Sequence, residues 1–136
     1  MTERQLRRAF EMPEADSDFL RRCECPWETV IEGEVRRLIL YDFAVPEGYG
    51  VPLVTLNLRI ERGYPDNQLD MVYFLPELTR RDGKGIAAVA GDQFDGKTWQ
   101  RWSRHRTAEN PWRPGIDNVE THLLLVTEWL KREFGK

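Results

Sequence analysis

The chain has 136 residues, a mass of 16.1 kDa and a formal net charge of −3. Its length fits one hydrophobic core, so we expect residues 1–136 to form a single domain. With 40% hydrophobic and 32% charged residues the chain is too apolar for a disordered protein, and no apolar run approaches the ~20 residues of a membrane span.

The first predicted element in chain order is a short helix over residues 13–22, with Phe19 and Leu20 facing the core. Pro13 separates this helix from the preceding residues, because proline interrupts a helix that reaches it from the N-terminal side. We expect residues 1–12 to form a frayed extension of the domain.

Two cysteines, Cys23 and Cys25, follow the predicted helix and lie too close in sequence to cross-link distant elements. Cysteine usage of this kind indicates a reducing compartment. The first residues also lack the apolar core of a signal peptide. We therefore expect a cytoplasmic protein.

Four strands in series are predicted next, because β-prone and apolar stretches lie between short turns rich in Gly, Pro, Asp and Asn, and in residues 51–60 apolar and polar residues alternate. The predicted strands cover residues 27–32, 35–43, 51–60 and 69–75. Strands joined in series by short connections form an antiparallel meander. Residues 77–115 are predicted to be a long irregular loop, since Gly83, Gly85, Gly91 and Gly96 interrupt any long element.

The last predicted element is a helix that begins at Asp117. Asp117 is its expected N-cap, and Glu120 three residues later completes a capping box. Its apolar residues recur at helical spacing at Val119, Leu123, Val126, Leu130 and Phe134. The fold class is therefore α+β, with an N-terminal helix, a four-stranded meander, a long loop and a C-terminal helix. This order excludes a doubly wound nucleotide-binding fold, in which strands and helices alternate.

The segment 97–113 has an unusual composition. Five of its residues are basic, only Glu109 is acidic, and it also contains three Trp and one His. Arg and Trp are enriched at recognition surfaces. A second interpretation is a basic loop whose Trp rings lie in the core while its Arg heads reach water. The net negative charge and the pI near 5.5 argue against a general nucleic-acid binder.

Motifs for metal, phosphate and common hydrolytic chemistry are absent. Cys23 and Cys25 are separated by one residue, and the nearest His is about 80 residues away, so we expect no metal and no cofactor. An acid–base group of Asp92, Asp95 and His105 is a weaker alternative, because Asp in Gly-rich segments mostly makes turns.

The order of elements resembles the ubiquitin-conjugating-enzyme fold, as do the turns Pro46–Tyr49 and Gly63–Pro65 and the Trp102-Ser103 pair. Narrower motifs resemble prokaryotic family E of the ubiquitin-conjugating-like proteins. These motifs are Asp70-Met-Val-Tyr-Phe, Phe94-Asp-Gly, Trp99-Gln-Arg-Trp-Ser-Arg-His105 and Pro111-Trp-Arg-Pro-Gly-Ile-Asp117. The resemblance runs from about Pro13 to Phe134.

The resemblance implies a bacterial protein whose operon also encodes a ubiquitin-like protein, an activating enzyme and a metalloprotease-domain protein. An antiphage role for such an operon is one hypothesis. This sequence departs from the active superfamily in one respect: it has no His-Pro-Asn stretch after the fourth strand and no Cys after Cys25. A thioester carrier needs a thiolate, so the standard catalytic role cannot be assigned to any residue at the usual place.

Three hypotheses follow. The first is a pseudoenzyme that binds the ubiquitin-like modifier or its activating enzyme noncovalently. Its expected contact residues are Trp99, Trp102, Arg104, His105 and Trp112, although these Trp rings could instead anchor the long loop on the core.

The second hypothesis is an active, non-standard conjugating enzyme with Cys23 or Cys25 as the nucleophile and His105 as the base. The third is an acidic-ligand or nucleic-acid site on segment 97–113, which would depend on Arg101, Arg104 and Arg106.

Overall fold

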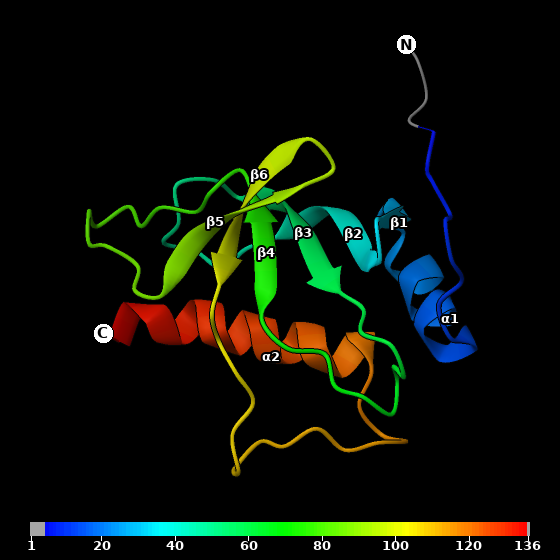
Figure 1. Ribbon diagram of the computed structural model, residues 1–136. Helices are drawn as coiled ribbons and strands as arrows, with labels where there is room; N and C mark the ends of the chain where they lie inside the picture. The colour runs from blue at the N-terminus through cyan, green and yellow to red at the C-terminus, as the bar shows by residue number, and fades with distance from the viewer. Residues whose placement is uncertain (1–4, 136) are drawn as a thin grey trace.

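A computed structural model describes residues 5–135 of the chain. Two helices and six strands form the fold, and a short 3-10 turn, η1, ends it (Figure 1). The elements are α1 (Glu14–Cys23), β1 (Trp27–Glu32), β2 (Val35–Ala44), β3 (Leu53–Arg59), β4 (Val72–Leu75), β5 (Val89–Phe94), β6 (Lys97–Trp102), α2 (Val119–Arg132) and η1 (Glu133–Gly135). Neither α1 nor α2 is long and apolar enough to cross a membrane.

The predicted α+β class is confirmed, but the sheet has six strands in the order β1-β2-β3-β4-β6-β5, and all neighbours are antiparallel. The four-stranded meander is therefore only part of it. The segment predicted to be an irregular loop contains the β5–β6 hairpin. Asp95 and Gly96 form its turn with φ of 55° and 72°. Two successive positive φ angles are typical of the two-residue turn whose twist matches the flanking strands.

The capping residues of α2 differ from the prediction by one position. Asn118 is the N-cap, and its side chain accepts from the N–H of Thr121 while the Thr121 hydroxyl accepts from the N–H of Asn118. Asp117 is instead buried and accepts three hydrogen bonds from Arg113. Because its carboxylate is used there, the neighbouring Asn118 caps the helix.

The main core lies between α2 and one face of the sheet. The alternation predicted for β3 places Val54, Leu56 and Leu58 in this core, and Trp102 of β6 is fully buried in it. A buried Tyr49 hydroxyl donates to Leu130 O at 2.6 Å, which ties the turn before β3 to the end of α2. This core fixes α2 against the strands that carry the candidate site.

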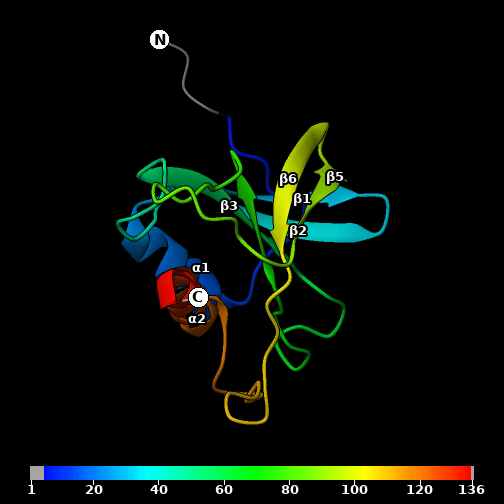
Figure 2. The ribbon, with the colours of Figure 1, turned by 90° about the vertical axis from the view of Figure 1, so that its left-hand side faces the viewer.

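A second, smaller core covers the opposite face of the sheet and consists of Val30, Ile39, Tyr73, Phe94 and Trp99. Figure 2 shows the β5–β6 hairpin on the side of the sheet away from α2. Arg37 is buried there and donates to Asp92 at 3.0 Å. The hairpin therefore gives both faces of the sheet a packed cover.

Residues 7–10, within the segment predicted to be a frayed extension, run beside β1. Ala9 donates its N–H to Thr29 O (2.9 Å), and Thr29 donates its N–H to Arg7 O (3.0 Å). The Arg7 guanidinium contacts both Glu28 of β1 and Asp95 at the hairpin turn. These bonds hold the pKa of the Glu28 carboxyl down at about 2. Residues 1–4 lie outside the described part of the chain.

Candidate functional site

The segment that joins β6 to α2, residues 103–118, carries most of the residues predicted to contact a partner. It has no helix or strand of its own. Side-chain hydrogen bonds hold it against the chain that leads into β4 and against α2. We use the name His105 surface for three side chains: His105 and Trp112, which were predicted to contact a partner, and Asp70, which is paired with His105.

His105 is paired with Asp70. Its Nδ1 lies 2.8 Å from Asp70 Oδ2, and the two side chains are 62% and 29% exposed. A carboxylate on one ring nitrogen of a histidine fixes the orientation of the ring and leaves the other nitrogen for a ligand or a proton. The His105 Nε2 has no partner within residues 5–135. The pair therefore presents one oriented, solvent-facing nitrogen.

Met71 follows Asp70 and adopts the left-handed backbone conformation, with φ of 59°. This conformation costs a non-glycine residue roughly 1–2 kcal/mol. Two hydrogen bonds hold it in place: Met71 donates its N–H to Arg104 O (3.2 Å), and its carbonyl accepts from His122 Nε2 (2.9 Å). The bend at Met71 delays the start of β4 and fixes the backbone beside Asp70.

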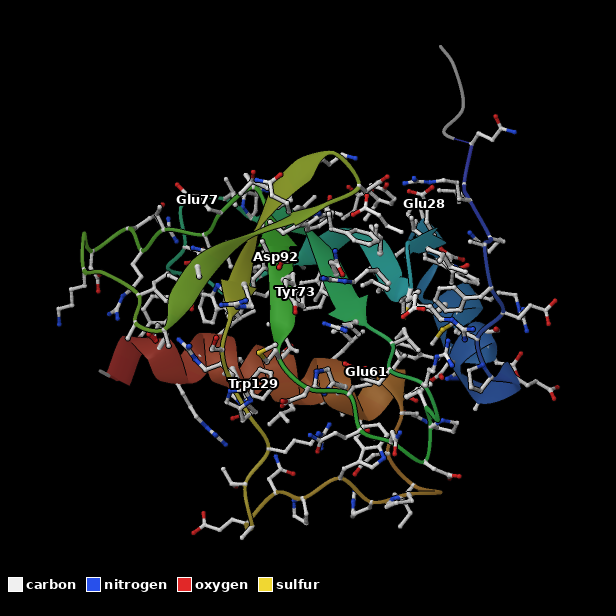
Figure 3. All side chains as sticks on the ribbon, viewed as in Figure 1. Glu28, Glu61, Tyr73, Glu77, Asp92 and Trp129 are labelled. Carbon is white, nitrogen blue, oxygen red and sulfur yellow. The ribbon has the colours of Figure 1, made fainter. Side chains whose placement is uncertain are left out.

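Arg106 and His122 form a buried support beneath the surface. Arg106 donates from Nε to Leu69 O (3.1 Å) and from Nη2 to His122 Nδ1 (2.9 Å). A guanidinium only donates, so Nδ1 of His122 is the acceptor and Nε2 carries the proton. Burial lowers the pKa of His122 to about 4. The ring stays neutral at physiological pH and packs edge-on against Trp129, which Figure 3 labels on α2.

Trp112 is half-buried and anchored on two sides. Its Nε1 donates to Pro65 O (2.9 Å), and the Arg106 guanidinium lies 4.7 Å from the centre of its ring. The neighbouring Tyr64 hydroxyl donates to Asp16 (2.6 Å), whose other oxygen accepts from the first N–H of α2, that of Val119. Helix α1, the Tyr64 turn and the start of α2 are therefore joined beneath this ring.

The other three predicted contact residues lie elsewhere. Trp99 and Trp102 are 2% and 0% exposed, one in each core, so their rings face no solvent. Arg104 turns toward the C-terminal end of α2, where Nη2 lies 3.4 Å from a Glu133 carboxylate oxygen and the guanidinium lies over the Trp102 ring. Of the five residues, only His105 and Trp112 belong to the His105 surface.

The two cysteines lie at the C-terminal end of α1 and just beyond it, with Cys23 exposed and Cys25 half-buried. Desolvation and the neighbouring Cys25 raise the pKa of the Cys23 thiol. The C-terminal end of a helix also disfavours an anion. Helix α1 and the end of β6 are apart in both Figure 1 and Figure 2. Among residues 5–135 the side chain paired with His105 is that of Asp70, and neither thiol contacts it.

The proposed acid–base group is not assembled. Asp92 binds Arg37 in the second core, and Asp95 binds Arg7 at the hairpin turn, whereas His105 binds Asp70. Segment 97–113 does not present a continuous basic face either. Four of its five basic side chains lie beside carboxylates: Lys97 beside Asp95, Arg104 beside Glu133, and Arg106 and Arg113 beside Asp117. These pairs offset most of the charge that a phosphate backbone would need.

Sequence reasoning identified His105 and Trp112 but missed the groups that position them. Asp70 lies 35 residues from His105, and Arg106 and His122 are 16 residues apart. No local spacing signals such pairs. The sequence did offer one signal, because Asp70 and His105 each lie within a motif that carried the family resemblance.

A family model described as prokaryotic E2 family E matches residues 12–133. The match covers nearly the whole chain, and the chain therefore belongs to this family of bacterial conjugating-enzyme-like proteins. No curated protein and no solved structure matches the chain.

Proposed function

We propose that this member of prokaryotic E2 family E binds a ubiquitin-like modifier or its activating enzyme noncovalently, through the His105 surface. Family membership supports a conjugating-enzyme-like role and partners of this general kind. The proposal adds that the chain holds its partner without a thioester. Within it, Trp99 and Trp102 contribute by fixing the hairpin and the segment that follows it.

The position of the two cysteines is the observation that carries the proposal. They are the only cysteines in the chain, and Cys23 ends α1 while Cys25 lies two residues beyond it. A thioester carrier needs a thiolate, which is favoured by a nearby cation or by a helix N-terminus. Cys23 lies at the C-terminal end of a helix, and although Arg22 is nearby, partial desolvation and Cys25 raise the pKa of its thiol overall. The surface with the oriented histidine contains no thiol.

The rigidity of the His105 surface supports a binding role. His105 is oriented by Asp70, and Trp112 is fixed by Pro65 and Arg106, so both side chains are ordered before a partner arrives. A preordered surface loses less conformational entropy on binding. Trp is also among the residue types that most often dominate the binding energy at protein interfaces.

The first test is an intact-mass measurement. The chain is mixed with ATP and with the activating enzyme and ubiquitin-like protein that the family resemblance predicts in its operon. The mass of each sample is measured with and without reductant. We expect no adduct, and we expect co-migration with one partner on a sizing column. An adduct that reductant removes, and that the double variant Cys23→Ala/Cys25→Ala does not form, would overturn the proposal and establish a conjugating enzyme.

Surface variants then locate the contact. We expect His105→Ala and Trp112→Ala to weaken the complex by roughly tenfold each, about 1.4 kcal/mol, as partial truncations at a hot spot do. Arg81→Ala is the matched control, because Arg81 is an exposed arginine on the loop between β4 and β5, and we expect it to leave binding unchanged. Equal binding by all three variants would show that the partner uses another surface.

A further inference from the structure

Within the described part of the chain, one edge of the sheet is paired with another segment, and the other edge is not. The β1 edge is covered, since Ala9 and Arg7 make backbone hydrogen bonds with Thr29. The β5 edge is the end of the strand order on the other side, and among residues 5–135 no segment pairs with it. An uncovered edge strand is a template for an additional strand. Proline, lysine and bulges, which commonly protect edges, are all absent from β5.

The pairing of the hairpin shows which backbone groups face outward. Ser103 donates its N–H to Ala88 O, so Ala88 and every second residue after it point their backbone groups toward β6. The residues between them point their N–H and C=O groups away from β6. These residues are Val89, Gly91 and Gln93. Val89 is half-buried, whereas Gly91 and Gln93 are exposed. The outward N–H and C=O groups of Gly91 and Gln93 are therefore the ones a partner strand can reach.

A hollow of about 220 Å³ adjoins this edge, and it is lined by Glu77, Val89, Ala90, Gly91, Thr98, Trp99 and Gln100. Gly91 keeps it open, because a Cβ at this position would lie 3.3 Å from Thr98 Cγ2. Glu77 is the one charged residue in the lining. Its exposed carboxylate forms no hydrogen bond or ion pair with residues 5–135, and Figure 3 shows Glu77 on the loop that follows β4.

We infer that the β5 edge binds an extended basic peptide segment of a partner protein, which adds a seventh strand and places a Lys or Arg side chain beside Glu77. Backbone hydrogen bonds to Gly91 and Gln93 would supply affinity, and the hollow would select the side chain, as in other cases of strand addition. The charge of the occupant follows from Glu77, since the other acid on this edge, Asp92, is already bound to Arg37 at 3.0 Å.

This site is separate from the proposed function, which concerns the His105 surface. The probe is a fluorescent peptide of alternating Val and Thr with one central Arg, and its binding is followed by fluorescence anisotropy. Two matched peptides test the mode. One carries Glu in place of Arg, and the other carries N-methyl groups on alternate backbone nitrogens, which remove the donors that a strand needs.

We expect the Arg peptide to bind and both matched peptides to bind at least tenfold more weakly. Gly91→Pro should weaken binding at least tenfold, since it removes an outward N–H that β6 does not use. Glu77→Gln should weaken it about threefold, the scale of one exposed ion pair, and Glu77→Lys should reverse the preference between the Arg and Glu peptides. Gln93→Ala keeps the backbone and should bind like the parent chain.

Hydrogen exchange provides the second measurement and does not depend on the variants folding. In the parent chain, the peptide should slow exchange of the Gly91 and Gln93 amides and leave that of His105 unchanged. Equal binding of the N-methylated peptide, no protection at β5, or no binding of the Arg peptide would each overturn the inference. None of these results would bear on whether the His105 surface holds a modifier or an activating enzyme.

Discussion

The buried histidine of α2 makes the stability of this fold depend on pH. The pKa of His122 is about 4 in the folded chain, because burial disfavours its charged form, whereas an unfolded chain has a value near 6.5. The folded pKa is the lower one, so between pH 6.5 and pH 4 the unfolded chain carries a proton on this histidine and the folded chain does not. The stability is therefore fully present above pH 6.5 and is lost as the pH falls toward 4.

The difference of 2.5 pKa units corresponds to about 3 kcal/mol, at 1.36 kcal/mol per unit, once both states have titrated. Between pH 7 and pH 5 the expected loss from His122 alone is about 2 kcal/mol. Glu28 and Asp117 have folded pKa values of about 2 and unfolded values near 4, so their contribution changes mainly below pH 5. Burial raises the pKa of Asp16, so a variant that lacks only the His122 titration is needed to separate the histidine from the remaining acids.

The assay is urea unfolding followed by Trp fluorescence at pH 7, 6 and 5. His122→Gln keeps a donor and an acceptor but cannot be protonated, so its free energy of unfolding should change by about 2 kcal/mol less than that of the parent chain over this range. His105→Gln is the matched control, since it removes the other histidine and leaves the surroundings of His122 intact. Parallel pH profiles for the parent chain and His122→Gln would refute the reasoning.

Three further predictions concern the side chains around the site and the hairpin. Arg106→Met should lower the free energy of unfolding by about 1–3 kcal/mol, measured by urea unfolding, because it leaves the buried His122 Nδ1 without its donor. An unchanged free energy of unfolding would contradict this role. Asp95→Asn should cost about 1 kcal/mol at low salt and less at high salt, since its bonds to Arg7 are partly exposed; salt-independent unfolding would contradict it. In a Cys25→Ala chain, iodoacetamide should modify Cys23 more slowly at pH 7.5 than it modifies a small-molecule thiol, because the raised pKa leaves less thiolate; faster modification, read by intact mass, would indicate an activated thiol.

The first four strands could be predicted because runs of apolar and β-prone residues lie between short turns, and β3 also alternates between apolar and polar residues. In β3, Val54, Leu56 and Leu58 are buried as the alternation requires. The same alternation places Asn57 on the polar, solvent-facing side of that strand, yet it is fully buried. The cause is the second core, which covers the opposite face of the sheet and could not be inferred while β5 and β6 were assigned to a loop.

The missed hairpin had a local signal in Asp95-Gly96, a pair that favours two-residue turns. The prediction missed the hairpin because glycine weakens a strand pattern, and Gly91 therefore indicates an interruption of the segment. In the structure Gly91 lies inside β5. Once β6 is a strand, the roles of its tryptophans follow. Trp99 and Trp102 are three residues apart and point to opposite faces of the sheet, so each enters a different core.

The excess of arginine over lysine has a structural explanation as well as a functional one. Three arginines, Arg37, Arg80 and Arg106, are buried, and each lies over an aromatic ring: Arg37 is 4.3 Å from the Tyr73 centroid, Arg80 is 4.9 Å from that of Phe134, and Arg106 is 4.7 Å from that of Trp112. A planar guanidinium can stack on a ring while its edge donates several hydrogen bonds, which an ammonium group cannot do.

In this fold the buried arginines cross-link segments that carry little apolar surface of their own, including the segment between β6 and α2. Arg106 joins the carbonyl before β4, the histidine of α2 and the Trp112 ring in one group. A composition rich in Arg and Trp therefore indicates internal support as readily as a recognition surface. The two interpretations are separated here by exposure: Arg106 is buried, whereas the oriented His105 beside it faces solvent and is available to a partner.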